Sequence, residues 1–348
     1  MFHDALVPFA ERRKIIMEKN EIKDAKKQFS KIGLILFLGT LLILTVQMLA
    51  MEIASNVPAI ASNGSLSFVI GMLPMYIIGY PIVFLMFKKV PVQISSEKKK
   101  MRPLHLLTAF LMCYAATCIF NMFANILTTI IGIIKQSPVD NVMQNVTSNI
   151  NPLANFLIIV ICAPIMEELL FRKAIIDRTA KYGEGVAIIF SGLVFGLFHG
   201  NLVQFSYAFF VGAFFGFIYL KTKNIAYPII LHILVNFVGS FIGSFILKAT
   251  NYMEMMEAIT SATTEAEMMT VMMDNMSGMM ILFLYEILIG VLIISGIVLL
   301  IINRKKFKLT AKETDIKKGQ RFKTVILNVG VILYSVFLIA VIVLQLIV

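Results

Sequence analysis

Cysteine is scarce in this chain of 348 residues, which holds only Cys113, Cys118 and Cys162. All three lie in apolar runs and none forms a C-x-x-C pair, so neither a disulfide framework nor a cysteine metal site is indicated. A cleavable signal peptide is not expected either, because the first apolar run begins near Ile32, after a long charged arm. We expect the cysteines to be small core residues.

Hydrophobic residues dominate the composition, at 59% of the chain with a mean hydropathy of +0.87. Soluble domains hold roughly half apolar residues, and here the excess lies in runs long enough to span a hydrocarbon core of roughly 30 Å. The nine runs are 32–52, 67–87, 104–134, 153–172, 185–201, 205–220, 225–247, 278–302 and 324–348. The predicted fold is all-α, a polytopic membrane helical bundle of about nine transmembrane helices.

Basic residues are almost absent from one set of connections between these runs. Only Lys135 and Lys248 lie there, and the other 29 of the 31 Lys and Arg residues lie in 1–31, 88–103, 172–184, 221–224 and 303–323. The positive-inside rule makes these five segments cytoplasmic, and an odd number of spans puts the N-terminus inside and the C-terminus outside. The rule also explains the net charge of +11 without a nucleic-acid partner. We expect an integral protein of the plasma membrane.

The chain divides into five segments on this pattern. Residues 1–31 form a basic cytoplasmic arm, expected to lie on the leaflet surface and contact anionic lipid. Residues 32–134 and 278–348 supply apolar spans around a polar core at 150–247. Residues 249–277 are acidic and Met-rich, with a spacing that suits an amphipathic helix on the outer surface or capping the bundle.

Two adjacent carboxylates, Glu167 and Glu168, lie inside the fourth apolar run. A charge in hydrocarbon is costly, so an unpaired one marks a functional site unless a helix end brings it to water. Glu168 and Arg172 are four residues apart, so on a helix they share a face, with the acid N-terminal to the base, which favours an ion pair. Glu167 is rotated by about 100° from that face and has no local partner.

Two histidines lie in the apolar runs that follow, each in a short pattern. Phe195-x-x-x-His199 ends the fifth run, and His232-x-x-x-Asn236 opens the seventh. His232 and Asn236 share a helix face, where the amide can orient the imidazole or hold a water. His199 is expected nearer the outer end of its span than the other site residues.

Three further features belong to these spans. Gly192 and Gly196 are four apart and would let a second helix approach closely. The depth of Glu167 and His232 favours a site that opens to the cytoplasm. Glu286, beside Tyr285 in the eighth run, is an isolated acid that we expect to hydrogen-bond to a neighbouring helix.

One carboxylate and two imidazoles can perform two kinds of chemistry. Glu167, His199 and His232 could bind a divalent metal, with zinc the candidate, and leave a position open for water. They could equally activate water directly, with Glu167 as general base and the imidazoles stabilising the oxyanion. The residues leave this choice open.

The three patterns, in this order on successive membrane helices, resemble the CPBP (ABI) family. This family contains CAAX prenyl proteases of the Rce1 type and bacteriocin-processing or immunity proteins, and the resemblance covers about 150–245. It implies an intramembrane metalloendopeptidase with a catalytic helical core at 150–247. In that family's pattern Glu167 activates water and Glu168, paired with Arg172, supports it. His199 and His232 bind metal or stabilise the oxyanion, and Asn236 assists.

The substrate implied by the resemblance is a membrane-associated protein or peptide, prenylated at a Cys-a-a-X end in the prenyl-protease subtype. Other intramembrane protease classes fit less well, because the sequence has no H-E-x-x-H, no aspartate pair inside the runs and no Gly-x-Ser-Gly. One alternative is a non-enzymatic bacteriocin-immunity or regulatory protein that binds another membrane protein through 249–277. A secondary transporter is the other, although the sequence shows no internal repeat.

Overall fold

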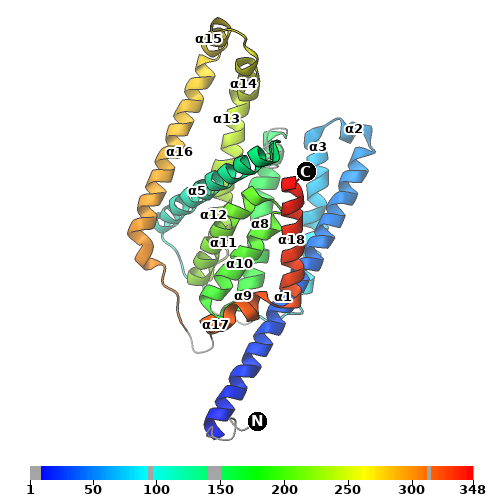
Figure 1. The fold of residues 1–348 in the computed structure, drawn as a ribbon, viewed down its shortest axis with the longest axis vertical. Coiled ribbons are helices and arrows are strands. Elements are labelled where there is room, and N and C mark those ends of the chain that lie inside the picture. The colour runs from blue at the N-terminus through cyan, green and yellow to red at the C-terminus, as the bar shows by residue number, and fades with distance from the viewer. Residues whose placement is uncertain (1–8, 93–96, 140–149, 312–314, 348) are drawn as a thin grey trace.

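The computed structural model describes residues 9–92, 97–139, 150–311 and 315–347, and within them every regular element is a helix (Figure 1). Eight of the described helices are long and apolar enough to cross a membrane, and a shorter apolar helix covers Glu184–Phe198. The predicted all-α membrane bundle is therefore confirmed. One of the nine predicted spans is too short to cross the bilayer alone.

The N-terminal helices do not all pack together, because the first five elements pack around one long helix and the sixth packs against the central and C-terminal helices (Figure 1). They are α1 (Phe9–Ser55), α2 (Pro58–Ala61), α3 (Gly64–Pro74), η2 (Met75–Gly79), α4 (Tyr80–Phe87) and α5 (Pro103–Lys135). Helix α1 runs without a break from the basic arm into the first span, and its N-terminal part extends beyond the bundle (Figure 1).

The central helices carry the candidate site. The first of them is one long span built from α7 (Pro152–Asn155), η3 (Phe156–Cys162), α8 (Ala163–Glu167), η4 (Glu168–Ala174), α9 (Ile175–Thr179) and η5 (Ala180–Tyr182). It is followed by α10 (Glu184–Phe198), α11 (Leu202–Thr222), α12 (Ala226–Asn236), η6 (Phe237–Ile242) and α13 (Gly243–Ala249).

The C-terminal part adds two long spans. Its elements are α14 (Tyr252–Ser261), α15 (Glu265–Asp274), α16 (Met276–Asn303), η7 (Arg304–Lys306), α17 (Lys318–Arg321), η8 (Phe322–Ile326) and α18 (Val329–Ile347). The last span begins later than the predicted 324, because the chain turns at Asn328. The Asn328 side chain caps α18 by accepting a hydrogen bond from the Val331 N–H at 3.1 Å.

Described parts of all five predicted cytoplasmic segments meet at one end of the bundle, here called the basic end. Lys99 N–H donates to Thr222 O at 2.7 Å, and Arg178 Nε donates to Val90 O at 2.8 Å. The basic end also includes contacts of Gln28 with Arg178, of Glu184 with Lys221 and Thr310, and of Ile316 with Tyr182. The opposite end, where α1, α5 and α13 finish, is the distal end.

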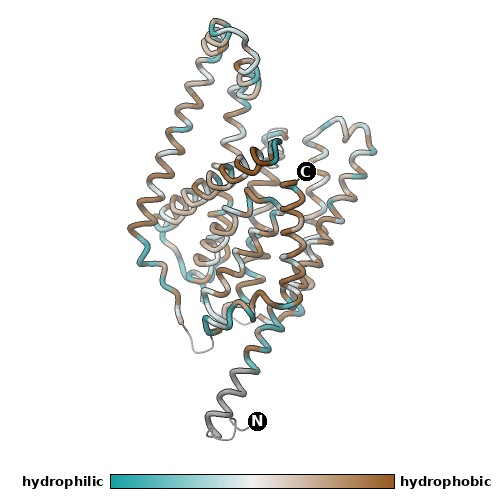
Figure 2. Tube along the Cα trace, viewed as in Figure 1, coloured by the Kyte–Doolittle hydropathy of each residue, from teal (hydrophilic) through white to brown (hydrophobic). Residues whose placement is uncertain are grey.

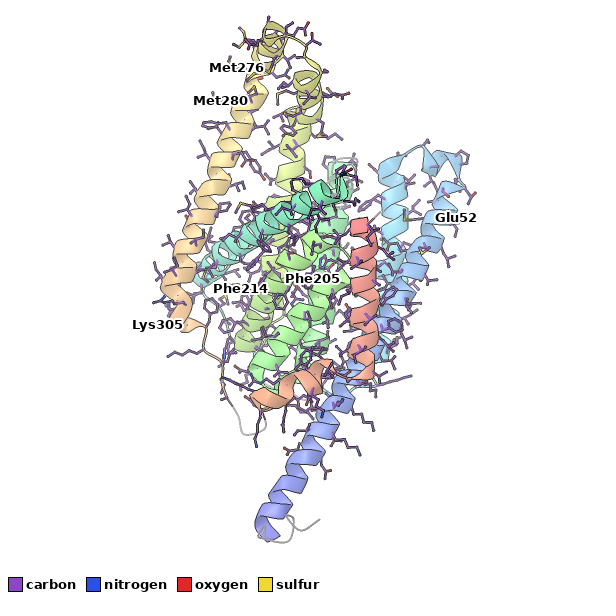
Figure 3. All side chains as sticks on the ribbon, in the orientation of Figure 1. Glu52, Phe205, Phe214, Met276, Met280 and Lys305 are labelled. Atoms are coloured by element: carbon purple, nitrogen blue, oxygen red, sulfur yellow. The ribbon has the colours of Figure 1, made fainter. Side chains whose placement is uncertain are left out.

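The Met-rich residues 249–277 form two short helices, α14 and α15, at the tip of a hairpin made by α13 and α16 (Figure 1). Met276 lies near this tip and Lys305 near the basic end of the same arm (Figure 3). Hydrophilic residues gather at the tip and at the basic end, with long hydrophobic stretches between them (Figure 2). Met269 is 60% exposed, whereas Met255 is buried, so α14 alone packs a methionine inward.

Glycine allows the central helices to pack closely. A Cβ on Gly192 would lie 2.8 Å from Phe209 O, and one on Gly196 would lie 3.2 Å from Phe205 O. The predicted close approach to this helix is therefore confirmed, and the partner is α11. The crossing of α1 and α18 is closer still, because a Cβ on Gly330 would overlap Ser30 O.

Candidate functional site

Glu167 and Glu168 lie near the middle of the long span Pro152–Tyr182. This span is irregular, because the π-helical segments η3 and η4 lie on either side of the short α8. Pro164 in α8 has no backbone N–H to donate, which accounts for the widened turn that precedes it. π-helical turns are rare and frequently occur at functional sites.

Glu168 and Arg172 form the ion pair that their spacing predicts. Arg172 Nε lies 3.0 Å from Glu168 Oε2, and both side chains are fully buried. The guanidinium carbon lies 4.2 Å from the centre of the Phe195 ring, while neither terminal nitrogen has a hydrogen-bond acceptor among the described residues. The aromatic face therefore takes the place of further acceptors around a buried cation.

The second oxygen of Glu168 binds His232, 64 residues away in the sequence. His232 Nδ1 lies 2.9 Å from Glu168 Oε1. Glu168 is the acidic partner of Arg172 in an ion pair and a carboxylate oxygen accepts, so Nδ1 donates in this hydrogen bond. His232 Nε2 is thereby directed away from Glu168 and toward Glu167.

Glu167 is the carboxylate without a close partner, as predicted. Its Oε2 lies 3.8 Å from His232 Nε2, which is longer than a hydrogen bond, and its side chain is 14% exposed. Glu167 lines a chamber of about 940 Å³, together with His199, His232 and Asn236. The structure thus brings the free carboxylate, both imidazoles and the amide to one cavity.

His199 reaches this cavity because α10 is short. Its 15 residues rise about 22 Å, so the helix starts at the basic end and finishes inside the bundle. His199 therefore lies at the end of α10 away from the basic end, and what differs from the prediction is the length of this helix, which is too short to cross the bilayer. His199 Nδ1 lies 2.9 Å from Phe195 O, a carbonyl that can only accept, so Nδ1 carries the proton and Nε2 is free.

Asn236 forms its hydrogen bond with a residue other than His232, the partner that its spacing of four residues suggested. Its Nδ2 donates to Ile159 O at 2.9 Å, which joins α12 to η3. Glu168, and not Asn236, therefore orients His232. Among the described residues, the second Nδ2 hydrogen and the Oδ1 of Asn236 have no partner, and Asn236 lies on the wall of the chamber.

The donor types of Glu167, His199 and His232 suit zinc, but their placement does not gather them. Among the described residues no three His, Cys, Asp or Glu side chains lie close enough together to hold a metal ion. This arrangement therefore does not fit a bound metal, and the chemistry below is derived from the side chains alone.

Phe195, the first residue of the predicted Phe-x-x-x-His pattern, shapes the site. It contacts both imidazoles edge-on, at 4.8 Å from His199 and 5.8 Å from His232 between ring centres. Sequence reasoning missed the polar residues Thr117, Asn121 and Asn125 of α5, which also line the chamber. Their spacing of four in an apolar run was a usable signal.

Glu286, singled out in the sequence, does not join the site. It is exposed on α16 and makes no hydrogen bond or ion pair with the described residues, so the expected hydrogen bond to a neighbouring helix is wrong.

The central segment matches a known protein family. Residues 149–238 match the family model described as Type II CAAX prenyl endopeptidase Rce1-like. The chain is 30% identical over 156 residues to the membrane-embedded CAAX protease MroQ of Staphylococcus aureus (strain USA300), covering 42% of this chain and 60% of that protein.

A second relative is the putative membrane peptidase YdiL of Bacillus subtilis (strain 168), 34% identical over 80 residues. That match covers 22% of this chain and 32% of YdiL, so the chain spans less than two thirds of either relative. No solved structure matches the chain. The resemblance given by the motifs is confirmed, and residues 149–238, which hold all six predicted site residues, are an Rce1-like segment within this integral membrane protein.

Proposed function

We propose that this protein is a membrane-embedded endopeptidase that hydrolyses a peptide bond with water activated by Glu167. The observation that carries the proposal is the pairing pattern of two adjacent carboxylates. Glu168 contacts both Arg172 and His232, while Glu167 faces the chamber and has no partner within hydrogen-bond distance among the described residues, with His232 Nε2 at 3.8 Å. A general base needs this combination of a free carboxylate and room for water.

The hydrolytic step uses groups that line the chamber. Glu167 takes a proton from water, and the water oxygen forms a bond to the carbonyl carbon of the substrate. The carbonyl electron pair moves onto its oxygen, giving a tetrahedral intermediate. When the C–N bond breaks, the proton held by Glu167 passes to the leaving nitrogen.

The other groups position the water and stabilise the oxyanion. Neutral His199 offers a lone pair at Nε2, which accepts a hydrogen from the attacking water. The free Nδ2 hydrogen of Asn236 can donate to the oxyanion, and His232 does so in its imidazolium form. Glu168 holds the His232 ring in place by accepting the hydrogen bond from Nδ1.

The substrate class follows from the family and the chamber. We propose a membrane-associated protein or peptide, with a prenylated Cys-a-a-X end as the first class to test. One wall of the chamber is apolar and includes Ile43, Phe68, Met72 and Leu338, and it could hold a lipid chain. We also propose that the protein lies in the plasma membrane with its basic end in the cytoplasm.

A catalytic metal is the alternative route to an activated water, as in the metalloprotease subtype. Binding would require Glu167, His199 and His232 to move closer together than they are here. The chelator arm of the experiment below separates the two routes.

The test is cleavage in liposomes, with prenylated Cys-a-a-X peptides and short membrane peptides offered to the purified protein. Wild type should cleave at least one peptide, and His232→Ala and Glu167→Ala should abolish that cleavage. Activity that survives a chelator supports the side-chain mechanism, and loss that zinc restores supports the metal. Cleavage unaffected by Glu167→Ala would favour a non-enzymatic regulatory or bacteriocin-immunity role instead.

A further inference from the structure

The chamber occupies only the distal half of the bundle. Its lining positions are 195–198 in α10, 203–211 in α11 and 338–341 in α18. Because α10 runs away from the basic end and α11 runs toward it, their stretches lie far from that end, and the stretch of α18 begins at the midpoint of the helix. None of the described residues of the basic-end loops lines the chamber, so Glu167 lies at its base. The expectation of a site that opens to the basic, predicted cytoplasmic end is therefore wrong.

The part of α5 beside the chamber has a polar face. Thr117, Asn121, Asn125 and Thr128 recur every three to four residues and so lie on one face of the helix. The rest of the helix surface here is apolar and exposed, with Ile130 at 48% and Ile133 at 72% exposure, as expected of a lipid-facing surface. The polar face thus points toward the inside of the bundle, as expected for a membrane helix whose apolar face contacts lipid.

The two asparagines on this face retain unused hydrogen-bonding groups. Asn125 Nδ2 donates to Asn121 O at 3.0 Å and to Asn121 Oδ1 at 3.2 Å. Within the described residues, Asn121 Nδ2 and Asn125 Oδ1 have no hydrogen-bond partner. One free amide donor and one free amide acceptor therefore lie beside the chamber. Together they can pair with the C=O and the N–H of a peptide group.

The polar face continues into a second cavity toward the distal end. This cavity has a volume of about 550 Å³ and shares Asn125 and Val203 with the chamber. Thr128 and Gln136 of α5 and its C-terminal neighbourhood line it. Polar groups therefore follow α5 from the level of the chamber to the distal end.

A peptide must be extended to be hydrolysed, and its backbone N–H and C=O groups then need partners at membrane depth. We propose that the α5 polar face is a peptide-binding subsite, along which an extended substrate segment reaches Glu167 from the distal end. The ligand of this subsite is a peptide in extended conformation, whose backbone N–H and C=O groups have no partners within the peptide itself. This inference rests on the proposed peptidase function and specifies the side from which its substrate comes.

The route is tested by cysteine labelling, which does not depend on activity. In a background with Cys113, Cys118 and Cys162 changed to Ala, the variants Asn121→Cys and Asn125→Cys are exposed to a membrane-impermeant maleimide on one side of the vesicle at a time. Met269→Cys marks the distal side and Lys305→Cys the basic side. If the background does not fold, the native cysteines are kept and labelling at residue 121 is measured by peptide mapping.

We expect residues 121 and 125 to react from the same side as Met269→Cys. Reaction from the side of Lys305→Cys, or no reaction from either side, overturns the route.

The subsite is tested by the kinetics of the peptide cleaved most rapidly in the liposome assay. Asn121→Leu and Asn125→Leu should each raise KM by about 3- to 10-fold, as expected for lost hydrogen bonds to the peptide. Met122→Leu, on the exposed face of the same helix, should leave KM unchanged. If the wild type cleaves and KM does not change, the subsite is wrong while the peptidase stands. If the wild type cleaves no peptide, the proposed function fails, and the labelling result alone decides the route.

Discussion

His232 Nδ1 lies 2.9 Å from Glu168 Oε1, although the two residues are 64 positions apart. This contact ties α12 to the span that carries Glu167 and fixes which imidazole nitrogen faces the chamber. It explains why two adjacent glutamates have separate tasks: Glu168 holds the histidine, and Glu167 faces the substrate space.

Glu168→Gln tests this positioning role. The amide oxygen can still accept from His232 Nδ1, but the Gln side chain no longer forms an ion pair with Arg172, so the imidazole is held less firmly. We expect kcat to fall by about 10- to 100-fold, the range seen when partners of functional histidines are removed. The ¹⁵N shifts of the His232 ring should change, because the hydrogen bond at Nδ1 changes. An unchanged ring spectrum together with reduced kcat would assign Glu168 a purely structural role.

Arg172→Leu tests the buried ion pair. Removing the cation leaves the buried Glu168 without its ion-pair partner and with His232 as its remaining contact, so we expect a loss of about 3–5 kcal/mol in the free energy of unfolding. Lys173→Leu changes an exposed neighbour and should cost far less. The double variant Glu168→Leu/Arg172→Leu should be more stable than Arg172→Leu, since no lone charge remains. Denaturation in detergent measures all three, and equal losses for Arg172→Leu and Lys173→Leu would contradict the account.

Gly192→Val tests the contact between α10 and α11. A Cβ at this position would lie 2.8 Å from Phe209 O, so the helices must separate and His199 must move with α10. We expect a loss of roughly 1–3 kcal/mol in stability and reduced cleavage. Gly290→Ala is the matched control, because nothing lies within 4 Å of that position. Thermal unfolding in detergent compares them, and equal midpoints would refute the tight crossing.

Glu267 provides a pH-dependent element outside the membrane spans. The Thr263 N–H and hydroxyl and the Thr264 N–H donate to its carboxylate, and these bonds lower the pKa of Glu267. A lowered folded pKa stabilises α15 above the ordinary carboxyl pKa, and this stability is lost as pH falls through the folded value. Amide protection at Thr263 should therefore drop below about pH 4. In Glu267→Gln, amide protection at Thr263 should not change with pH in this range. The same loss of protection in that variant would show that Glu267 is not its cause.

Much of the fold was accessible from the sequence because hydrophobic runs and charge bias are local patterns. The Glu168–Arg172 pair and the glycine contact of α10 follow from spacings of four residues, and the approximate positions of the spans follow from the hydrophobic runs. Contacts between distant segments, such as His232 with Glu168, do not follow from spacing. The fifth span was predicted wrongly, because an apolar run of near-span length was taken to cross the whole membrane.

The side on which the chamber opens was also predicted wrongly. Counting residues from a helix end gives the depth of Glu167. It does not say which half of the bundle is filled with packed side chains and which half contains a cavity. Here the basic half is closed by packing around buried groups such as Arg172 and Ile176, and the distal half is hollow. The polar face of α5 gave a local signal of this asymmetry.

The most direct test of the central claim compares two glutamates in one liposome cleavage assay. Glu167→Gln removes the free carboxylate of the chamber, and Glu286→Gln removes an exposed carboxylate on α16 as the matched control. We expect Glu167→Gln to lower kcat at least about 100-fold with an unchanged melting temperature, and Glu286→Gln to retain wild-type kcat. Wild-type turnover by Glu167→Gln would contradict the assignment of this residue as the base.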